Sequence, residues 1–258
     1  MTKYQVIEAL QELAPLSFQD GFDNAGLQVG LVDEDLDGVL VCLDITEGVV
    51  AEAARLGCNL IVSHHPLVFQ PLKQVTDATW QQRSVMTAIK NGITIYSAHT
   101  NLYNAIGGVN YKIASLLGLQ NLEWLEAKSE SAGSGVVGEL PAEEDSIAFL
   151  TRLKGVFDVD CVMHSEIVKT SVRRIAVCGG AGSFLMEAAR AKGADCFITG
   201  EISYHHYFDA DGLLLVALGH YQSEQFTKDL LRDFIAGRFP DVRVETTSLN
   251  TNPIMYLK

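Results

Sequence analysis

Hydrophobic positions along the chain follow two alternating patterns, one helical and one typical of buried strands. Residues 4–13 carry apolar side chains at nearly helical spacing, and Pro15, which cannot continue a helix, follows them. Short apolar runs predict strands at residues 39–43, 59–62, 93–97, 136–140, 159–163, 175–178, 196–199, 213–218 and 242–246. Longer stretches predict helices at residues 47–56, 80–90, 109–117, 146–154, 184–191 and 223–236. This alternation predicts an α/β fold with mainly parallel or mixed sheets.

One strand–helix–strand unit occurs twice in the sequence. In both copies a Val-Cys pair lies in the first strand, an EAAR segment lies in the helix, and a glycine precedes the second strand. The EAAR segments occupy residues 52–55 and 187–190. Such units can look alike by chance, but identity at all three points favours an internal duplication. We therefore expect two α/β halves of similar topology.

A short polar stretch of small residues, KSESAGS at 128–134, is suited to a linker between the halves. We expect the first α/β domain to comprise residues 1–128 and 225–258 and to carry the adjacent histidines of the chain. The second α/β domain is expected at residues 129–224, ending in the GHxxSE motif.

Histidines follow three of the predicted strands. His64 and His65 follow the strand at 59–62, and His99 follows the strand at 93–97. Ligands of open α/β sheets bind beyond the carboxyl ends of the strands, and parallel strands bring these ends together, so the three histidines are candidates for a metal or catalytic site. For the His-His pair alone, a surface loop with two solvated histidines is the alternative.

The third histidine-bearing strand end contains His220 and Glu224, which are four residues apart. If a helix has begun there, both side chains lie on one helix face. An imidazole and a carboxylate at this spacing can form half of a site for Zn, Mn or Fe. The alternative is an ordinary helix start, with Ser223 as the cap and Glu224 near the helix dipole.

Other polar residues give weaker signals. His205 and His206 lie where the second repeat matches the His-His pair of the first, but a polar loop explains them better. His164 belongs to no constellation. Gly107-Gly108 opens a predicted helix, where backbone amides could approach an anion, although a tight turn is the simpler interpretation.

Composition narrows the function classes. The chain has 258 residues, with 19 Lys and Arg against 32 Asp and Glu, so its net charge is −13. An acidic protein is a poor counter-ion for nucleic acid or an anionic membrane, whereas a metal cation is still a possible ligand. No apolar run approaches a membrane span, and the N-terminus looks like an amphipathic helix, not a signal peptide. The five cysteines are scattered in mostly apolar runs without a CxxC motif, which indicates reduced residues in a cytoplasmic protein.

Five short segments together resemble the NIF3-like family, also called GTP cyclohydrolase I type 2 homologues. They run in the family's order and are FDNAGLQVG at 22–30, SHHP at 63–66, AHTNL with NAIGGVN at 98–110, ITGE at 198–201 and GHxxSE at 219–224. The resemblance implies two similar α/β/α halves and a toroidal homohexamer with dinuclear metal centres. Matched residue by residue, it implies that His64, His65, His220 and Glu224 are metal ligands and that His99 lies in or beside the ligand set.

One position departs from the family pattern. The AHTNLD motif of the family ends in a metal-binding aspartate, and Tyr103 stands at that place here. A phenol has a pKa near ~10 and is a poorer ligand than a carboxylate at neutral pH. The metal position beside Tyr103 is therefore expected to bind weakly, to be empty, or to be completed by His99, Asp44 or water. One or two divalent ions (Zn, Mn or Fe) are expected per subunit.

The combined reading predicts a metal-dependent hydrolase acting on a phosphorylated or nucleotide-like small molecule, with His99 as the catalytic proton shuttle. The GTP cyclohydrolase label is doubtful, because nothing in the sequence indicates guanine recognition and there is no P-loop. The alternative is a non-catalytic metal-binding or scaffold assembly, which the Tyr103 departure favours. Nucleic-acid binding is disfavoured by the net charge.

Overall fold

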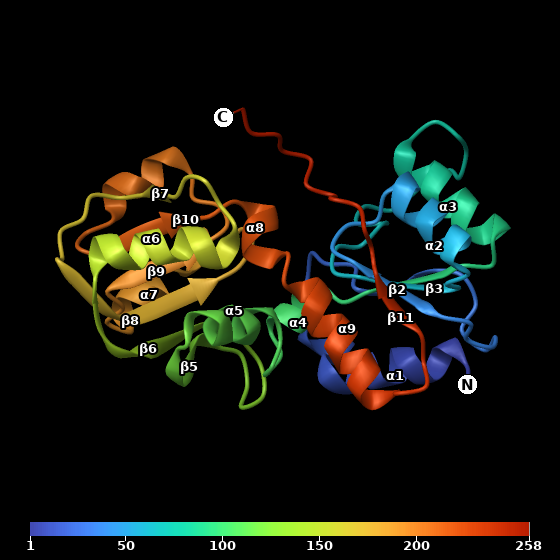
Figure 1. The fold of residues 1–258 in the computed structure, drawn as a ribbon, viewed down its shortest axis with the longest axis horizontal. Helices are drawn as coiled ribbons and strands as arrows, with labels where there is room; N and C mark the ends of the chain where they lie inside the picture. The colour runs from blue at the N-terminus through green and yellow to red at the C-terminus, as the bar shows by residue number, and fades with distance from the viewer. Residues whose placement is uncertain (258) are drawn as a thin grey trace. The chain divides into compact units, whose positions relative to one another are not determined.

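The computed structural model describes residues 1–257, which form two compact units (Figure 1). The first unit contains residues 1–102 together with 227–257, and the second contains Tyr103–Phe226. Each unit has one sheet with helices packed on it, so the protein has the α/β fold that the sequence predicts. Among the described residues, no helix combines the length and apolar character needed to cross a membrane.

The first unit is built on a sheet of five strands in the order β1-β4-β3-β2-β11. The strands are β1 (Gly26–Val29), β2 (Val39–Cys42), β3 (Leu60–Ser63), β4 (Thr94–Ser97) and β11 (Val244–Thr246). All pair in parallel except β1, which is antiparallel to β4. The helical segments are α1 (Lys3–Leu13), η1 (Leu16–Phe18), α2 (Glu47–Leu56), α3 (Trp80–Lys90) and α9 (Thr227–Arg238), and α4 (Thr100–Tyr103) spans the division between the units.

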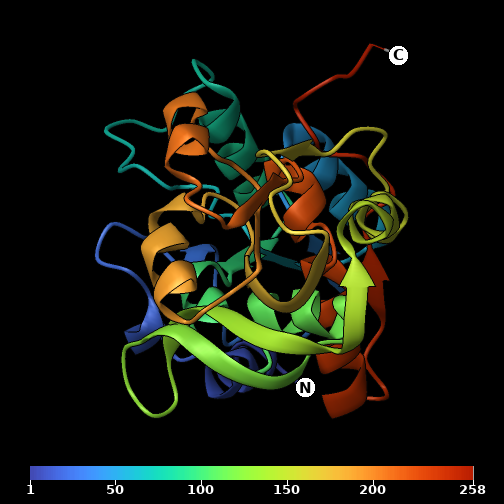
Figure 2. The same cartoon turned by 90° about the vertical axis from the view of Figure 1, so that its left-hand side faces the viewer.

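The second unit has a mixed sheet of six strands in the order β5-β6-β8-β9-β10-β7. The strands are β5 (Gln120–Ala127), β6 (Gly133–Asp145), β7 (Met163–His164), β8 (Ser171–Cys178), β9 (Cys196–Thr199) and β10 (Leu214–Ala217). The helical segments are α5 (Val109–Leu117), α6 (Ser146–Phe157), η2 (Ser183–Leu185), α7 (Met186–Ala191), η3 (Tyr204–Asp209) and α8 (His220–Glu224). Strands β5 and β6 form a long curved hairpin, drawn in green to yellow-green in Figure 2.

The internal repeat is visible as two runs of three parallel strands. Strands β2, β3 and β4 are neighbours in the first sheet, and β8, β9 and β10 are neighbours in the second. The same backbone hydrogen bond occurs at both strand ends: Ala98 N–H donates to Ser63 O at 2.9 Å, and Leu218 N–H donates to Thr199 O at 3.0 Å. Gly57 and Gly193 have φ values of +66° and +68°, as glycines that end helices often do. The two halves therefore share a topology.

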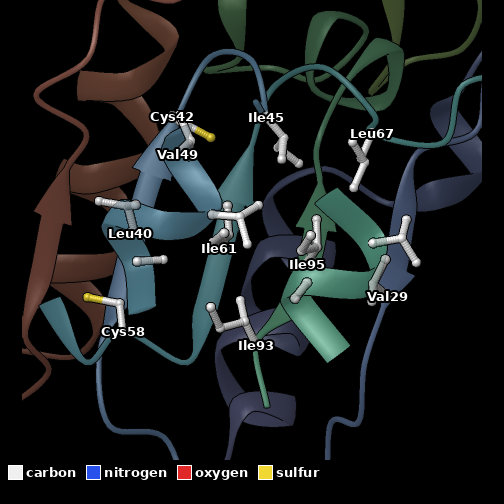
Figure 3. Close-up of a cluster of buried hydrophobic side chains, with 14 residues drawn as sticks. Val29, Leu40, Cys42, Ile45, Val49, Cys58, Ile61, Leu67, Ile93 and Ile95 are labelled. Carbon is white, nitrogen blue, oxygen red and sulfur yellow. The ribbon is translucent and has the colours of Figure 1, made fainter. Parts of the chain in front are cut away.

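The parallel strands are mostly apolar where they are buried on both faces. In β2, β3 and β4 every residue is buried, and one core gathers side chains of these strands with those of α2 and α3 (Figure 3). In the second unit β8, β9 and β10 contribute to a core beneath α7. These cores hold the carboxyl ends of the strands in fixed positions.

Several predicted elements differ from the observed ones. The segment KSESAGS at 128–134 contains the turn of the β5–β6 hairpin, and β5 thereby joins the second unit. The strand expected at 159–163 is reduced to the two-residue edge strand β7, and no residue of the expected range is buried. The helix expected at 223–236 is divided into α8 and α9.

Candidate metal-binding site

Three histidines gather at the carboxyl ends of two neighbouring strands of the first unit. His64 and His65 follow β3 directly, and His99 lies two residues beyond the end of β4. Their ring centroids are separated by 4.8 Å (His64–His65), 5.2 Å (His64–His99) and 5.4 Å (His65–His99). One nitrogen from each ring lies within 4.8 Å of the others, so the three imidazoles could hold a metal ion together.

Each of these imidazoles is oriented by an oxygen atom at Nδ1. Nδ1 of His64 lies 2.8 Å from the carbonyl oxygen of Ala98. Since a carbonyl oxygen only accepts, this contact assigns the proton of the neutral His64 ring to Nδ1 and the lone pair to Nε2. Nδ1 of His65 lies 2.7 Å from Asp44 Oδ1, and the carboxylate favours the same tautomer. Metal-ligating histidines in proteins are usually held in this way.

The carboxylate of Asp23 holds Nδ1 of the His99 ring. Its Oδ1 lies 2.8 Å from His99 Nδ1, and its Oδ2 accepts hydrogen bonds from the backbone N–H and the hydroxyl of Thr100. Burial by itself would raise the pKa of Asp23, but the hydrogen bond and charge of His99 and the Thr100 hydrogen bonds lower it to about 2. Asp23 therefore stays ionised and fixes the ring of His99. The sequence placed this aspartate in the FDNAGLQVG segment that resembles the family, but indicated no role for it.

Asp44 lies just beyond the end of β2, at the same edge of the sheet. Its Oδ1 holds His65, and its Oδ2 accepts a hydrogen bond of 2.7 Å from the hydroxyl of Thr251. The sequence pointed to Asp44 as a residue that could complete a metal position. In the structure its two oxygens contact His65 and Thr251.

In the second unit, His220 and Glu224 lie on one face of α8. Nε2 of His220 is 3.1 Å from Glu224 Oε2, and Nδ1 of His220 is 3.1 Å from Glu201 Oε1. The side chain of Glu224 is 1% exposed, whereas that of His220 is 34% exposed. The helix has therefore begun at His220, as the four-residue spacing required, and an imidazole and a carboxylate meet there.

Tyr103 contacts the same glutamate. Its hydroxyl donates a hydrogen bond to Glu224 Oε1. Burial and then the negative charge of Glu224 raise the pKa of Tyr103 well above its usual value, so the phenol stays protonated. Gly180, at φ +60°, packs against both groups, and a Cβ there would lie 2.8 Å from the phenol oxygen and closer still to the carboxylate. The backbone at Gly180 thus makes room for the pair formed by Tyr103 and Glu224.

The weaker candidates lie elsewhere. His205 and His206 are in the exposed segment η3, and neither belongs to a metal-type group among the described residues. His164 is exposed in β7, where its Nδ1 lies 2.7 Å from the carbonyl oxygen of Ser165. Gly107 has a φ of +76°, and Gly108 is the residue that precedes α5.

The donor atoms have the chemistry of a transition-metal site. Neutral imidazoles suit Zn, Mn and Fe, and carboxylates bind the same ions. The three histidines of the first unit have Nδ1 held by oxygen acceptors, which is the arrangement that ligating histidines need. The fold and these groups define an α/β protein with two related halves and His and Glu groups that could bind metal.

Comparison with known proteins identifies the family. The model of the family Duf34/NIF3 (NGG1p interacting factor 3) matches residues 1–253, and the chain belongs to this family. A relative from Lactococcus lactis, named GTP cyclohydrolase 1 type 2 homolog, is 38% identical over 239 residues, which cover 90% of each chain. The crystal structure of a Bacillus cereus protein related to NIF3 has a TM-score of 0.93 at 25% identity and covers 100% of this chain and 99% of that one. A hypothetical protein from Staphylococcus aureus has a TM-score of 0.94 at 27% identity, with the same coverage.

Proposed function

We propose that this protein is a metal-dependent hydrolase whose metal ligands are His64, His65, His220 and Glu224. The observation that carries the proposal is the arrangement of His64, His65 and His99, whose Nδ1 atoms are all held by oxygen acceptors at one edge of a parallel sheet. If these three positions served packing alone, apolar side chains would serve it better than imidazoles. The family membership of the chain supports the same ligands.

The proposal includes a divalent ion, Zn, Mn or Fe, with one or two ions per subunit. The sequence predicts Tyr103 as a weak ligand, but the hydrogen bond from its hydroxyl to Glu224 supports one ion per subunit, held without the phenol. A protonated phenol adds no negative charge, whereas a carboxylate at that place would add one. A lower anionic charge reduces the affinity for a second cation.

A bound ion would polarise the electrophilic group of the substrate and acidify a water molecule. His99 is the proposed proton shuttle of the reaction. Asp23 holds Nδ1 of this ring, so proton exchange takes place at Nε2, and the carboxylate stabilises the imidazolium that forms. His99 is partly exposed, which allows it to reach a substrate and to exchange protons with solvent.

The proposed substrate is a phosphorylated or nucleotide-like small molecule. The first backbone amides of the nine-residue helix α5 are suited to a phosphate group, while the N–H of Gly108, the residue before the helix, donates to Ala105 O at 3.1 Å. The relatives' name refers to GTP cyclohydrolase, but the chain has no P-loop motif and no residue that indicates guanine recognition. A phosphoester is therefore the first substrate class to test.

The second candidate function is a non-catalytic metal-binding or scaffold protein. The contact between Tyr103 and Glu224 favours it, because a phenol that occupies one carboxylate oxygen reduces the anionic ligands available to catalytic metals. A homohexamer and a cytoplasmic location are part of both proposals. The hexamer rests on family resemblance, and the location is supported by five free cysteines, four of them buried. Mass determination by light scattering tests the hexamer.

The decisive experiment measures metal content and turnover together. Protein purified without chelator is analysed for bound metal, stripped, and reloaded with Zn²⁺, Mn²⁺ or Fe²⁺ before assay against a panel of phosphoesters and nucleotides. The hydrolase proposal predicts turnover restored by at least one ion. His64→Ala combined with Glu224→Ala is expected to lose the metal, whereas His205→Ala, which changes an exposed histidine outside the metal-type groups, is expected to keep it.

If the protein binds metal but turns over no substrate with any of the three ions, the hydrolase proposal fails and the non-catalytic function is supported. Unchanged metal content in the double variant would overturn both candidates.

A further inference from the structure

The C-terminal segment of the first unit runs from β11 to the edge of the sheet that carries the histidines. Thr247 N–H donates to Val41 O at 2.9 Å and extends the pairing of β11 with β2 by one residue. Ser248 donates to Glu52 Oε1 from its N–H at 3.2 Å and from its hydroxyl at 2.6 Å. The Thr247 hydroxyl donates to Glu52 Oε2, so both oxygens of this buried carboxylate hold the segment.

These contacts fix the path of the next residues. Glu52 is on α2, and its side chain is 7% exposed. The side chain of Leu249 packs against Gly48 at the start of the same helix, where a Cβ would lie 3.1 Å from Leu249 Cδ1. The chain is thus anchored on α2 before it reaches Thr251.

Thr251 then contacts the carboxylate that orients a proposed metal ligand. Its hydroxyl donates to Asp44 Oδ2 at 2.7 Å, and the other oxygen of Asp44 lies 2.7 Å from Nδ1 of His65. A carboxylate held at one oxygen can rotate about its χ2 bond, but a carboxylate held at both oxygens has one orientation. The position of the His65 ring therefore depends on a hydroxyl that is 207 residues from Asp44 in the sequence.

We propose that Thr251 is a positioning residue of the metal site, which acts through Asp44 on His65. Residues 247–251 then form part of the metal site. This inference rests on the proposed metal-binding function. It assigns to Thr251 a part of the metal affinity, because partners of ligating histidines contribute to the affinity of a site by orienting the ring and raising its basicity.

The test compares Zn²⁺ affinity in the full-length protein by competition with a chromophoric chelator. Thr251→Val keeps the shape of the side chain and removes the hydroxyl, and it is expected to weaken binding about tenfold, the lower end of the ~10–100-fold range for such partners. Thr251→Ser keeps the hydroxyl and is expected to bind within about twofold of the wild type. Thr246→Val is the matched control, because it makes the same change in β11, just before the segment, at a hydroxyl for which the described residues provide no hydrogen-bond partner.

A double-mutant cycle separates positioning from general stability. If Thr251 acts through Asp44, Thr251→Val has no further effect on affinity when Asp44 is already alanine. In the metal-free protein, NMR of the imidazole nitrogens is expected to show His65 protonated at Nδ1 in the wild type and as a mixture of tautomers in Thr251→Val. Should that variant fail to fold, Thr251→Ala takes its place in both measurements.

The outcomes are distinct. If the wild type binds Mn²⁺ or Fe²⁺ instead of Zn²⁺, the same comparison is made with that ion. A wild type that binds none of the three ions overturns the proposed function and this inference with it. A wild type that binds Zn²⁺ while Thr251→Val binds it equally well overturns this inference alone. A loss of affinity that Thr251→Ser does not rescue, or that is equally large on the Asp44→Ala background, also overturns it.

Discussion

Replacing Asp23 by asparagine tests the electrostatic argument for the ring of His99. The carboxylate accepts from two donors of Thr100 and contacts Nδ1 of His99, and its side chain is fully buried. An asparagine amide offers one acceptor and one donor group, so its –NH₂ would face either the donors of Thr100 or the backbone N–H of Asn24, which donates to Asp23 Oδ1 at 2.7 Å. On the second side it would also force the neutral ring of His99 to accept at Nδ1, which is the other tautomer. We expect the variant to lose both stability and the fixed orientation of His99.

The size of the effect follows from the pKa of Asp23, which falls from 3.8 to about 2 on folding. At ~1.36 kcal/mol per pKa unit, the ionised carboxylate contributes about 2.5 kcal/mol to the free energy of unfolding at pH 7. Because the folded-state pKa is the lower one, this contribution is fully present above about pH 5 and is lost as the pH falls toward 2. By the same relation about half of it, ~1.3 kcal/mol, is left at pH 3.

Thermal unfolding of metal-free protein measures this effect. At pH 7, Asp23→Asn is expected to lower the melting temperature by about 5 °C or more, given ~2–4 °C per kcal/mol for a chain of this size. The difference from the wild type is expected to shrink as the pH is lowered from 5 to 3. Asp33→Asn, at an exposed aspartate, is the control and is expected to change little. Equal melting temperatures for Asp23→Asn and the wild type at pH 7, or a difference that does not depend on pH, would refute the reasoning.

Three further predictions concern Gly180, Tyr103 and the cysteines. Gly180→Ala is expected to lower the free energy of unfolding in denaturant by about 2–4 kcal/mol, because it places a Cβ at a positive φ and against the Glu224 carboxylate. The control is Gly237→Ala on α9, where a Cβ meets open space, and it is expected to be neutral or stabilising. Tyr103→Asp is expected to raise the metal content per chain, and Tyr103→Phe is expected to leave it unchanged. A thiol reagent is expected to modify Cys161 rapidly and the other four cysteines only after unfolding, since those four are buried.

The strands that could be predicted from sequence are those whose burial requires an almost uninterrupted run of apolar residues. Strands β2, β3, β4, β9 and β10 are buried at every residue, as are residues 175–178 of β8, and these stretches appear as mostly apolar runs. Strand β5 was missed because its sequence, QNLEWLEA, is mostly exposed at the edge of its sheet. Strand β1 is only four residues long and half exposed, so its sequence, GLQV, contains no continuous apolar run.

The candidate site also has parts that the sequence predicts and parts that it does not. The approach of His99 to the His64–His65 pair follows from topology, since parallel neighbours end at one edge and local sequence marks where each strand ends. The partners of these rings could not be predicted in this way. Asp23 is 76 residues from His99 and lies in a loop, where no periodicity indicates the direction of a side chain. The phenol of Tyr103 and the carboxylate of Glu224 are 121 residues apart, and only packing around Gly180 determines their contact.

The discontinuity of the first unit has a consequence for biosynthesis. Its sheet receives β11, and its helical layer receives α9, from the last part of the chain, after all of the second unit has been made. On the ribosome, the second unit can therefore complete its sheet while the first still exposes the edge of β2 that β11 will cover. We expect the nascent first unit to be the vulnerable one, open to unwanted strand pairing until β11 has been made. A premature stop codon that removes only β11 and the residues after it would then compromise a sheet whose other strands were encoded more than 140 residues earlier.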